Sequence, residues 1–241
     1  MTGTLLNIAA ILIGGTLGLV FGARIPERLK TTVVAGLGLF VAAMGAQMFL
    51  QSGNQLIVLG ALMIGALLGE WARIEDRLQS FGQALERRFS RDPAGDAQGE
   101  QEGGRSPRFI RGFMVASLLY CIGPMTILGS IQDGLTGDYS LLAVKSTLDG
   151  LASIAFASTL GVGVLFSALV VLIFQGGISL LAAQLSSQVT TAMLNEMTAT
   201  GGLLLLGLAI SNLLEIKKIR VGNFLPALAV APLIVWVLSL F

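Results

Sequence analysis

The chain has 241 residues, of which 54% are hydrophobic and only 12% are charged, and its mean hydropathy is +0.82. Soluble domains carry about 25% charged residues, so this composition excludes an ordinary soluble protein and predicts a polytopic membrane protein. A net charge of +1 gives no support to nucleic-acid binding, the absence of histidine excludes an imidazole metal site, and a single cysteine excludes an intrachain disulfide.

Eight apolar stretches are long enough to cross a bilayer, which takes about 20 mostly apolar residues. They cover residues 4–22, 32–50, 54–72, 110–131, 140–160, 163–184, 199–215 and 223–240. The first stretch has no basic segment before it, so we expect a retained helix and not a cleaved signal peptide. The run 140–184 exceeds one crossing, and we divide it at Gly161-Val162-Gly163. The predicted fold is all-α, with about eight transmembrane helices.

Fourteen of the fifteen lysines and arginines fall in the hydrophilic segments 23–30, 73–111 and 216–222. With eight spans, these segments all lie on one side of the membrane. The loops on the other side carry acidic residues and no lysine or arginine. The positive-inside rule therefore predicts a multi-pass protein of the bacterial inner membrane, with cytoplasmic basic loops and both termini outside.

The only long hydrophilic piece is a predicted cytoplasmic insert over residues 73–107. Its first part, 74–89, has apolar residues at three- and four-residue spacing, which predicts an amphipathic helix on the inner membrane surface. Its second part, 90–107, is rich in Gly, Pro and polar residues, which predicts a disordered linker. A solvated connector is the alternative for the whole insert.

Residues 3–22 and 146–165 align without a gap and share seven identical positions. The order of later motifs also matches, which predicts two parallel four-helix repeats, 1–131 and 138–241, related by an axis along the membrane normal. Ala10, Gly14 and Gly18 form a stripe of small residues in the first span. Such stripes let helix backbones approach closely, so we expect the first and fifth spans to contact each other or equivalent neighbours across this axis.

Lys145 is the one cation outside the basic segments, and Asp149 follows it by four residues within an apolar span. This spacing places both on one helix face, and Ser153 continues that face by one turn. A charge at membrane depth costs about 2.5–3.5 kcal/mol on insertion scales, so such residues usually face the protein interior or a solute path. Two interpretations stay open, a buried ion pair that fixes helix register and a site in a solute or ion path.

The fourth span contains Pro124, which predicts a kink or break near Ile122-Gly123. Polar residues follow this break toward the outer side, and we expect them to approach the charged pair: Thr126, Ser130, Gln132 and Asp133. Gln175 adds an amide near the middle of the sixth span. We expect Glu196 to be a solvated residue of the outer loop before the seventh span.

These residues predict a transporter or channel for a small solute, a monovalent cation or a proton, with a midplane site between the fourth and fifth spans. The candidate site residues are Lys145, Asp149, Ser153, Pro124, Thr126, Ser130, Gln132, Asp133 and Gln175. One aspartate beside a lysine is a poor cage for a multivalent metal, and no nucleophile has a base beside it, so we expect no metal, no cofactor and no enzyme activity.

The alternative function is a non-transporting membrane scaffold or sensor that acts through the insert 73–107. Apart from the bilayer and a small solute or ion, a second copy of the chain could be a partner, and nucleic acid is not expected.

Several motifs resemble those of a known family: IGPMTILGSIQDGLTGDYSLLAVKSTLDGLASIAFASTLGVGVLFSA, QGGISLLA, ATGG and KKIRVGNFLPAL. They are similar to the YdfK/YqgA-like bacterial inner-membrane proteins, a domain of unknown function, and the similarity covers nearly the whole chain. The resemblance implies a polytopic fold and a membrane location, without an activity or site residues.

Overall fold

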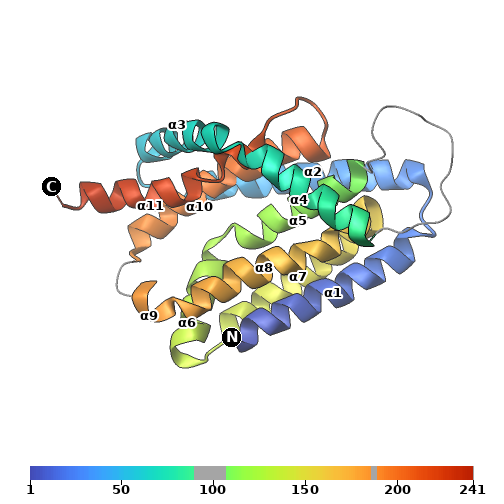
Figure 1. The fold of residues 1–241 in the computed structure, drawn as a ribbon, viewed down its shortest axis with the longest axis horizontal. Helices are drawn as coiled ribbons and strands as arrows, with labels where there is room; N and C mark the ends of the chain where they lie inside the picture. Colours follow the sequence, from blue (N-terminus) through green and yellow to red (C-terminus); the bar gives the residue numbers. More distant parts are fainter. Residues whose placement is uncertain (90–106, 186–188, 241) are drawn as a thin grey trace.

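The computed structural model describes residues 1–89, 107–185 and 189–240, and the regular elements within these ranges are all helical (Figure 1). In chain order they are α1 (Thr2–Gly22), α2 (Glu27–Phe49), α3 (Gln55–Ala72), α4 (Ile74–Phe89), α5 (Pro107–Cys121), α6 (Pro124–Thr136), α7 (Ser140–Leu160), α8 (Gly163–Leu180), α9 (Ala182–Leu185), α10 (Thr191–Leu208), the π-helical turn η1 (Ala209–Leu213), the 3-10 turn η2 (Val221–Phe224) and α11 (Ala227–Leu238). The predicted all-α fold is confirmed.

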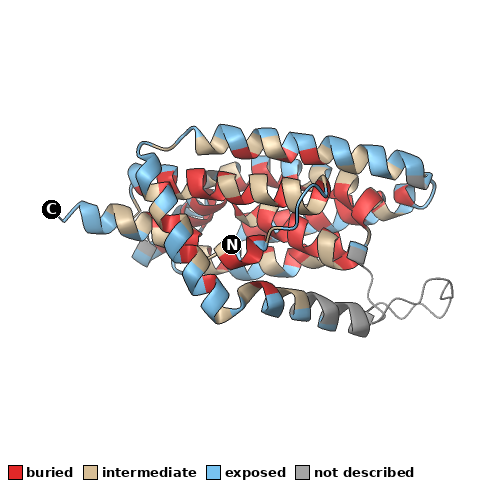
Figure 2. Cartoon of the chain, turned by 90° about the horizontal axis from the view of Figure 1, so that it is seen from above, coloured by how far each residue is buried: buried red, intermediate tan, exposed pale blue. Residues whose placement is uncertain are grey.

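Seven helices of the described chain are long and apolar enough to cross a membrane, and α5 with α6 makes an eighth if this bent pair is one span. The outward faces of these helices carry large apolar side chains; Leu67, for example, is 73% exposed and Trp71 is 86% exposed. Figure 2 shows the buried residues gathered between the helices and the exposed ones on their outer faces. An apolar outer surface of this extent matches a bilayer environment and not water.

The fourth predicted span is broken where the sequence indicates. α5 ends at Cys121, and α6 begins at Pro124, after a sharp bend of 62°. Gly123 has a φ of 151°, which few residues other than glycine adopt readily, and proline is favoured at the first position of a helix. The Gly-Pro pair therefore ends one helix and starts the next, and it sets α6 at a steep angle to α5.

α1 and α7 run parallel and pack backbone against backbone, which confirms the predicted contact between the first and fifth spans. A Cβ atom added at Gly14 would lie 2.2 Å from the carbonyl oxygen of Gly150, and one at Gly18 would lie 2.4 Å from that of Ile154. Only glycine fits such a close approach. This packing sets the position of α1 next to the charged residues of α7.

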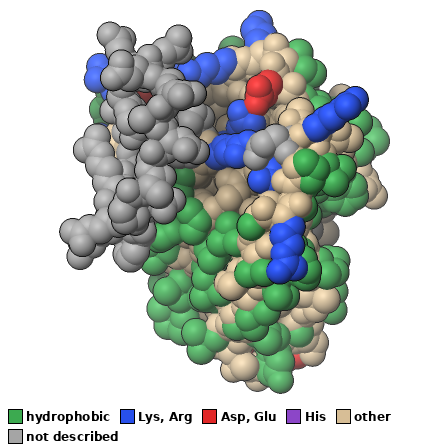
Figure 3. All heavy atoms as spheres, turned by 90° about the vertical axis from the view of Figure 1, so that its right-hand side faces the viewer, with side chains coloured by type: hydrophobic (Ala, Val, Ile, Leu, Met, Phe, Trp, Pro, Cys, Tyr) green, Lys and Arg blue, Asp and Glu red, His purple; other side chains and the backbone are tan. Residues whose placement is uncertain are grey.

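The two ends of the bundle differ in charge. The end that holds Met1, the α2–α3 connection and the start of α10 is called here the amino-terminal end. The opposite end, called the basic end, holds the α1–α2 connection, α4 and the start of α5, and Figure 3 shows lysine and arginine side chains gathered on it. This distribution matches the side assignment of the loops that the sequence predicts.

One difference from the predicted elements follows from local sequence. The seventh span was expected to begin at residue 199, but α10 begins at Thr191, because Thr190 caps it by accepting a hydrogen bond from the Met193 amide at 3.3 Å. The predicted amphipathic helix 74–89 corresponds to α4, whereas the predicted linker 90–107 lies almost wholly outside the described residues. The two-repeat arrangement, with its boundaries 1–131 and 138–241, stays a prediction.

Candidate functional site

Lys145 and Asp149 form a buried ion pair half way along α7. Asp149 is the tenth of the 21 residues of this helix, and the Lys145 ammonium is bonded to Asp149 Oδ2. The two side chains are only 8% and 11% exposed. Taking two charges out of water costs free energy that their attraction offsets only when further hydrogen bonds are present. The surroundings of Asp149 must therefore supply such bonds.

α1 and α8 supply the further bonds. Asn7 on α1 donates through Nδ2 to Asp149 Oδ2 at 2.9 Å and to Gln175 Oε1 on α8 at 3.0 Å. Both amide side chains are fully buried. The structure therefore joins the predicted residues Lys145, Asp149 and Gln175 in one polar cluster built from three helices.

Asn7 is a site residue that the sequence analysis missed. It is the only amide in α1, between apolar residues on both sides, so its polarity was a usable signal. In the alignment of the two predicted repeats, Gly150 lies opposite Asn7, so the amide is not repeated in the second copy. A lone buried amide in a membrane helix generally needs a partner, and here the partners are Asp149 and Gln175.

Tyr120 on α5 extends the cluster toward the basic end. Its hydroxyl lies 2.8 Å from Ser153 Oγ, and its ring centroid lies 6.0 Å from the Lys145 ammonium nitrogen. That distance permits a cation–π attraction. Ser153 is thus placed beside the pair as predicted from its helix face, and Tyr120 is a second residue that the sequence analysis missed.

The polar residues of α6 bond elsewhere. Thr126 donates to the Tyr120 carbonyl oxygen at 3.2 Å, and Ser130 donates to the carbonyl oxygen of Thr126. Gln132 is exposed and donates to Asp138 at 2.7 Å, where hydrogen bonds from Ser140 and Gln132 lower the pKa of the Asp138 carboxyl. None of these described contacts joins α6 directly to the charged pair. The break at Pro124 therefore sets the direction of α6, and it does not bring an α6 side chain into a described bond with the pair.

Asp133 marks the amino-terminal end of the polar interior. Its carboxylate is buried, accepts a hydrogen bond from the Gly3 amide at 3.1 Å, and lies 3.2 Å from the Met1 amino group. The next residue, Gly134, packs against the backbone of Ser179 on α8. Asp133 therefore belongs to the interface of α1, α6 and α8, above the Asn7–Gln175 pair.

An apolar layer closes the polar cluster on the side that faces the basic end. Ile11, Phe156, Leu160 and Val164 are each at most 2% exposed and belong to the main hydrophobic core. Beyond them, at the basic end, a polar pocket of about 380 Å³ is lined by Lys30, Arg108, Arg111, Thr159, Leu160 and Glu215, among others. Ser153 and Thr159 are six residues apart on α7, so about 9 Å of helix separates the cluster from this pocket.

Glu196 corrects an expectation. It lies in α10 and is 4% exposed, instead of lying in a solvated loop. Its carboxylate accepts hydrogen bonds from Ser52 Oγ at 2.8 Å, from the Gly53 amide at 2.8 Å and from the Asn54 amide at 2.9 Å. Glu196 therefore holds the α2–α3 connection in place and is not a solvated loop residue.

Three further glutamates make their contacts at the basic end. Glu70 pairs with Arg220 at 3.0 Å, and Glu215 pairs with Arg111. Glu75 is 7% exposed and accepts a hydrogen bond from the Gly222 amide at 2.7 Å, while its own amide donates to Asn223 Oδ1 at 2.8 Å. The buried carboxylate of Glu75 is a contact that the sequence pattern does not predict.

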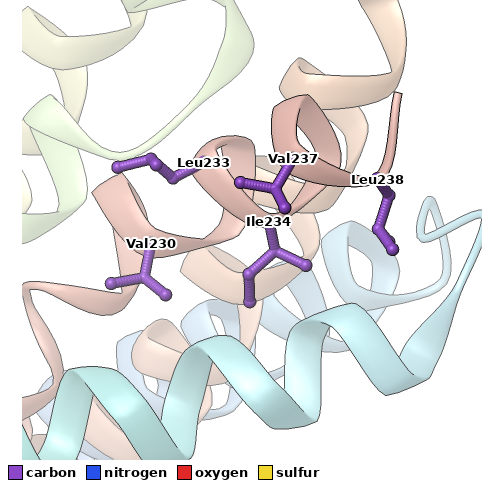
Figure 4. A pocket seen from close by; sticks show the side chains of 5 residues that line it. All are labelled: Val230, Leu233, Ile234, Val237 and Leu238. Carbon is purple, nitrogen blue, oxygen red and sulfur yellow. The ribbon is translucent and has the colours of Figure 1, made fainter. Parts of the chain in front are cut away.

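Two other hollows on the described surface are apolar. The groove in Figure 4 has a volume of about 340 Å³ and is lined only by α11 residues, namely Val230, Leu233, Ile234, Val237 and Leu238. A second apolar groove lies along α1 and α8. Both match lipid-facing surface. Within the described residues, no group of three or more His, Cys, Asp or Glu could hold a metal ion. The expectation of no cofactor stays a prediction.

The chain is similar to two curated bacterial proteins along nearly its full length. It is 32% identical over 245 residues to the "Uncharacterized membrane protein YdfK" of Bacillus subtilis (strain 168), an alignment that covers 100% of this chain and 98% of that protein. It is 31% identical over 232 residues to the "Uncharacterized protein YqgA" of Escherichia coli (strain K12), which covers 95% of this chain and 94% of that protein. No solved structure matches the chain.

The resemblance drawn from the sequence motifs is thereby confirmed. Residues 2–236 match the family described as "Protein of unknown function (DUF554)", and the chain belongs to that family of membrane proteins.

Proposed function

We propose that the protein is a transporter or channel that carries a small solute, a monovalent cation or a proton past the Lys145–Asp149 pair. The observation that carries this proposal is the buried polar cluster of Lys145, Asp149, Asn7 and Gln175 in an otherwise apolar bundle. Ionisable residues inside membrane helices mostly mark substrate or ion pathways. Asp149 is half way along α7, which supports a site near the bilayer midplane.

The order of polar and apolar layers supports movement across the membrane. Polar residues continue from Asp133 at the amino-terminal end to Ser153 and Tyr120, and a polar pocket enters from the basic end. Between them stands one apolar layer that includes Phe156 and Leu160. A site that is polar on one side and closed by a thin apolar layer on the other fits alternating access, in which the closing layer changes sides.

The charge distribution supports an orientation as well. Lysines and arginines at the basic end belong on the cytoplasmic side by the positive-inside rule, so the amino-terminal end and both termini would face outward from the inner membrane. The polar cluster would then be reached from the outside, and the pocket at Arg108 and Arg111 from the cytoplasm.

Flux in vesicles tests the proposal. The purified protein is reconstituted in liposomes, and the uptake of protons, sodium, potassium and small zwitterions is compared between the native chain and Asp149→Asn. Asparagine keeps the shape of the side chain and removes its charge, so flux should be lost.

Asp138→Asn is the matched control, since Asp138 is an exposed aspartate in the connection before α7. Its flux should equal that of the native protein. Equal flux in Asp149→Asn and Asp138→Asn would reject the site, and no flux of any species in the native protein would favour the scaffold or sensor role.

A further inference from the structure

Four polar atoms buried between α1 and α8 lack a hydrogen-bond partner among the described residues. They are Thr4 Oγ1 and Asn7 Oδ1 on α1, and Gln175 Nε2 and Ser179 Oγ on α8. Their residues are at most 4% exposed. A buried polar atom left unmatched costs about 1–3 kcal/mol, and most such atoms in folded proteins bind another group or ordered water. Four together on two facing helices indicate a place for a ligand.

These atoms form two levels of one path, called here the α1–α8 ladder. α1 runs away from the amino-terminal end and α8 returns to it, so Thr4 is level with Ser179 and Asn7 with Gln175. Thr4 also packs close to Gly176, the residue after Gln175, because its methyl group lies 3.8 Å from where a Cβ atom of Gly176 would be. The two levels are therefore adjacent. Asp133 stands above the first level, and Asp149 accepts from Asn7 below the second.

The donors and acceptors of the ladder are mixed. Gln175 Nε2 only donates, Asn7 Oδ1 only accepts, and the two hydroxyls do both. A metal cation would suit the oxygens, but it would face the Nε2 donor and compete with the Lys145 ammonium already bonded to Asp149. Water both donates and accepts, and it satisfies every atom of this set.

We propose that the α1–α8 ladder holds a file of water molecules that connects Asp149 with the amino-terminal end, and that the proton is the species this site exchanges. The inference deepens the transport function proposed above and rests on it for the exchange step. A hydronium ion in the file gives its proton to the Asp149 carboxylate, which leaves water and a neutral acid. Lys145 keeps its charge, and its attraction to Asp149 weakens, which frees the pair to rearrange.

Few other titratable groups face this site. They are Lys145 on α7, Tyr120 and Cys121 on α5, Asp133 on α6 and the Met1 amino group; α1 and α8 contain no ionisable side chain. Asp133 lies at the outer entrance to the ladder, where it pairs with the Met1 amino group, whereas Asp149 lies at the inner end of the ladder, half way along α7, where it pairs with Lys145. Proton exchange is therefore assigned to Asp149.

An experimental structure tests the water file directly. At a resolution that shows ordered water elsewhere in the chain, we expect density within hydrogen-bond distance of Thr4 Oγ1, Asn7 Oδ1, Gln175 Nε2 and Ser179 Oγ. Density for a single metal ion, or side-chain atoms filling the space, would overturn the inference and leave the transport function in place.

Proton flux supplies the second test, followed with a pH-sensitive dye in vesicles. Ser179→Ala and Gln175→Leu should lower proton flux by about tenfold or more, because each removes a group that orders the water file. Ser167→Ala is the matched control, since Ser167 is a buried serine of the same helix whose hydroxyl already donates to Val164; its flux should be unchanged.

The flux assay distinguishes failure of the transport function, of proton exchange and of the water file. Flux of sodium or potassium without a pH change would overturn proton exchange and leave transport standing. Absence of flux for every species in the native protein would overturn transport, and the exchange step with it. Native proton flux that is unaffected in both ladder variants would overturn the water file alone.

Discussion

Asn7 Nδ2 on α1 lies 2.9 Å from Asp149 Oδ2 on α7, although 142 residues separate them in the chain. The close packing of α1 on α7 makes this bond possible, because glycines at the helix contact bring the two backbones together. The bond offsets part of the cost of burying Asp149, and a second bond from the same nitrogen reaches Gln175. Asn7 therefore joins all three helices of the candidate site.

Replacing Asn7 with leucine should disturb both bonds at once. Asp149 and Gln175 would each lose a donor, so we expect the free energy of unfolding to fall by about 1–3 kcal/mol and flux to fall with it. Thermal unfolding in detergent and flux in vesicles measure the two effects. Thr16→Val is the control on the same helix, since Thr16 is exposed and bonds only to its own helix. A stable and fully active Asn7→Leu variant would contradict the assigned role.

Replacing Gly14 with alanine should destabilise the protein through packing alone. The new Cβ would lie 2.2 Å from the Gly150 carbonyl oxygen, so α1 and α7 must move apart, at a cost of about 1–3 kcal/mol. Gly36→Ala on α2 is the control, because no atom lies within 4 Å of its Cβ position. We expect a lower unfolding temperature for Gly14→Ala and little change for Gly36→Ala; similar unfolding temperatures would contradict the close contact.

Replacing Phe156 with alanine should thin the apolar layer between the polar cluster and the pocket at the basic end. Phe156 is 2% exposed, and its removal leaves a cavity next to Ser153. We expect a leak, seen as faster passive ion flux in vesicles. Phe40→Ala removes a phenylalanine that is 62% exposed on α2, and its leak should match that of the native protein. A tight Phe156→Ala variant would mean that the closing layer lies elsewhere.

Replacing Glu75 with alanine should loosen α4 from the bundle. The buried carboxylate holds the Gly222 amide, and its loss leaves that amide unmatched. Hydrogen exchange should increase in α4 and in η2, whereas the α1–α7 contact should keep its protection. Asp76→Ala changes the adjacent, exposed carboxylate and should have no such effect. Unchanged exchange in Glu75→Ala would show that other contacts hold α4.

Much of this architecture is readable from the sequence because membrane spans have strong local signals. Apolar length predicts the helices, Pro124 predicts the break before α6, and the glycine stripe predicts the approach of α1 to α7. The spacing of Lys145 and Asp149 predicts their bond, since both lie on one helix. These features depend on neighbours in the chain or on one helix face.

The parts that escaped prediction depend on contacts between distant helices. Asn7 and Tyr120 reach the charged pair from α1 and α5, and the motif that contains the pair does not encode them. Glu196 looked like a loop residue, because its three partners belong to the α2–α3 connection far away in sequence. The polar side of α6 was expected to approach the pair, but Thr126 bonds to the Tyr120 carbonyl oxygen and Gln132 bonds to Asp138.

The measurement that tests the central claim most directly is proton and ion flux through a double variant, Lys145→Met with Asp149→Leu. Each single change should cost about 3–5 kcal/mol, because it leaves one buried charge unpaired, and the double change should restore most of the stability. A pair that only fixes helix register would then be dispensable. Our account predicts a stable double variant without flux, and a stable double variant with native flux would contradict it.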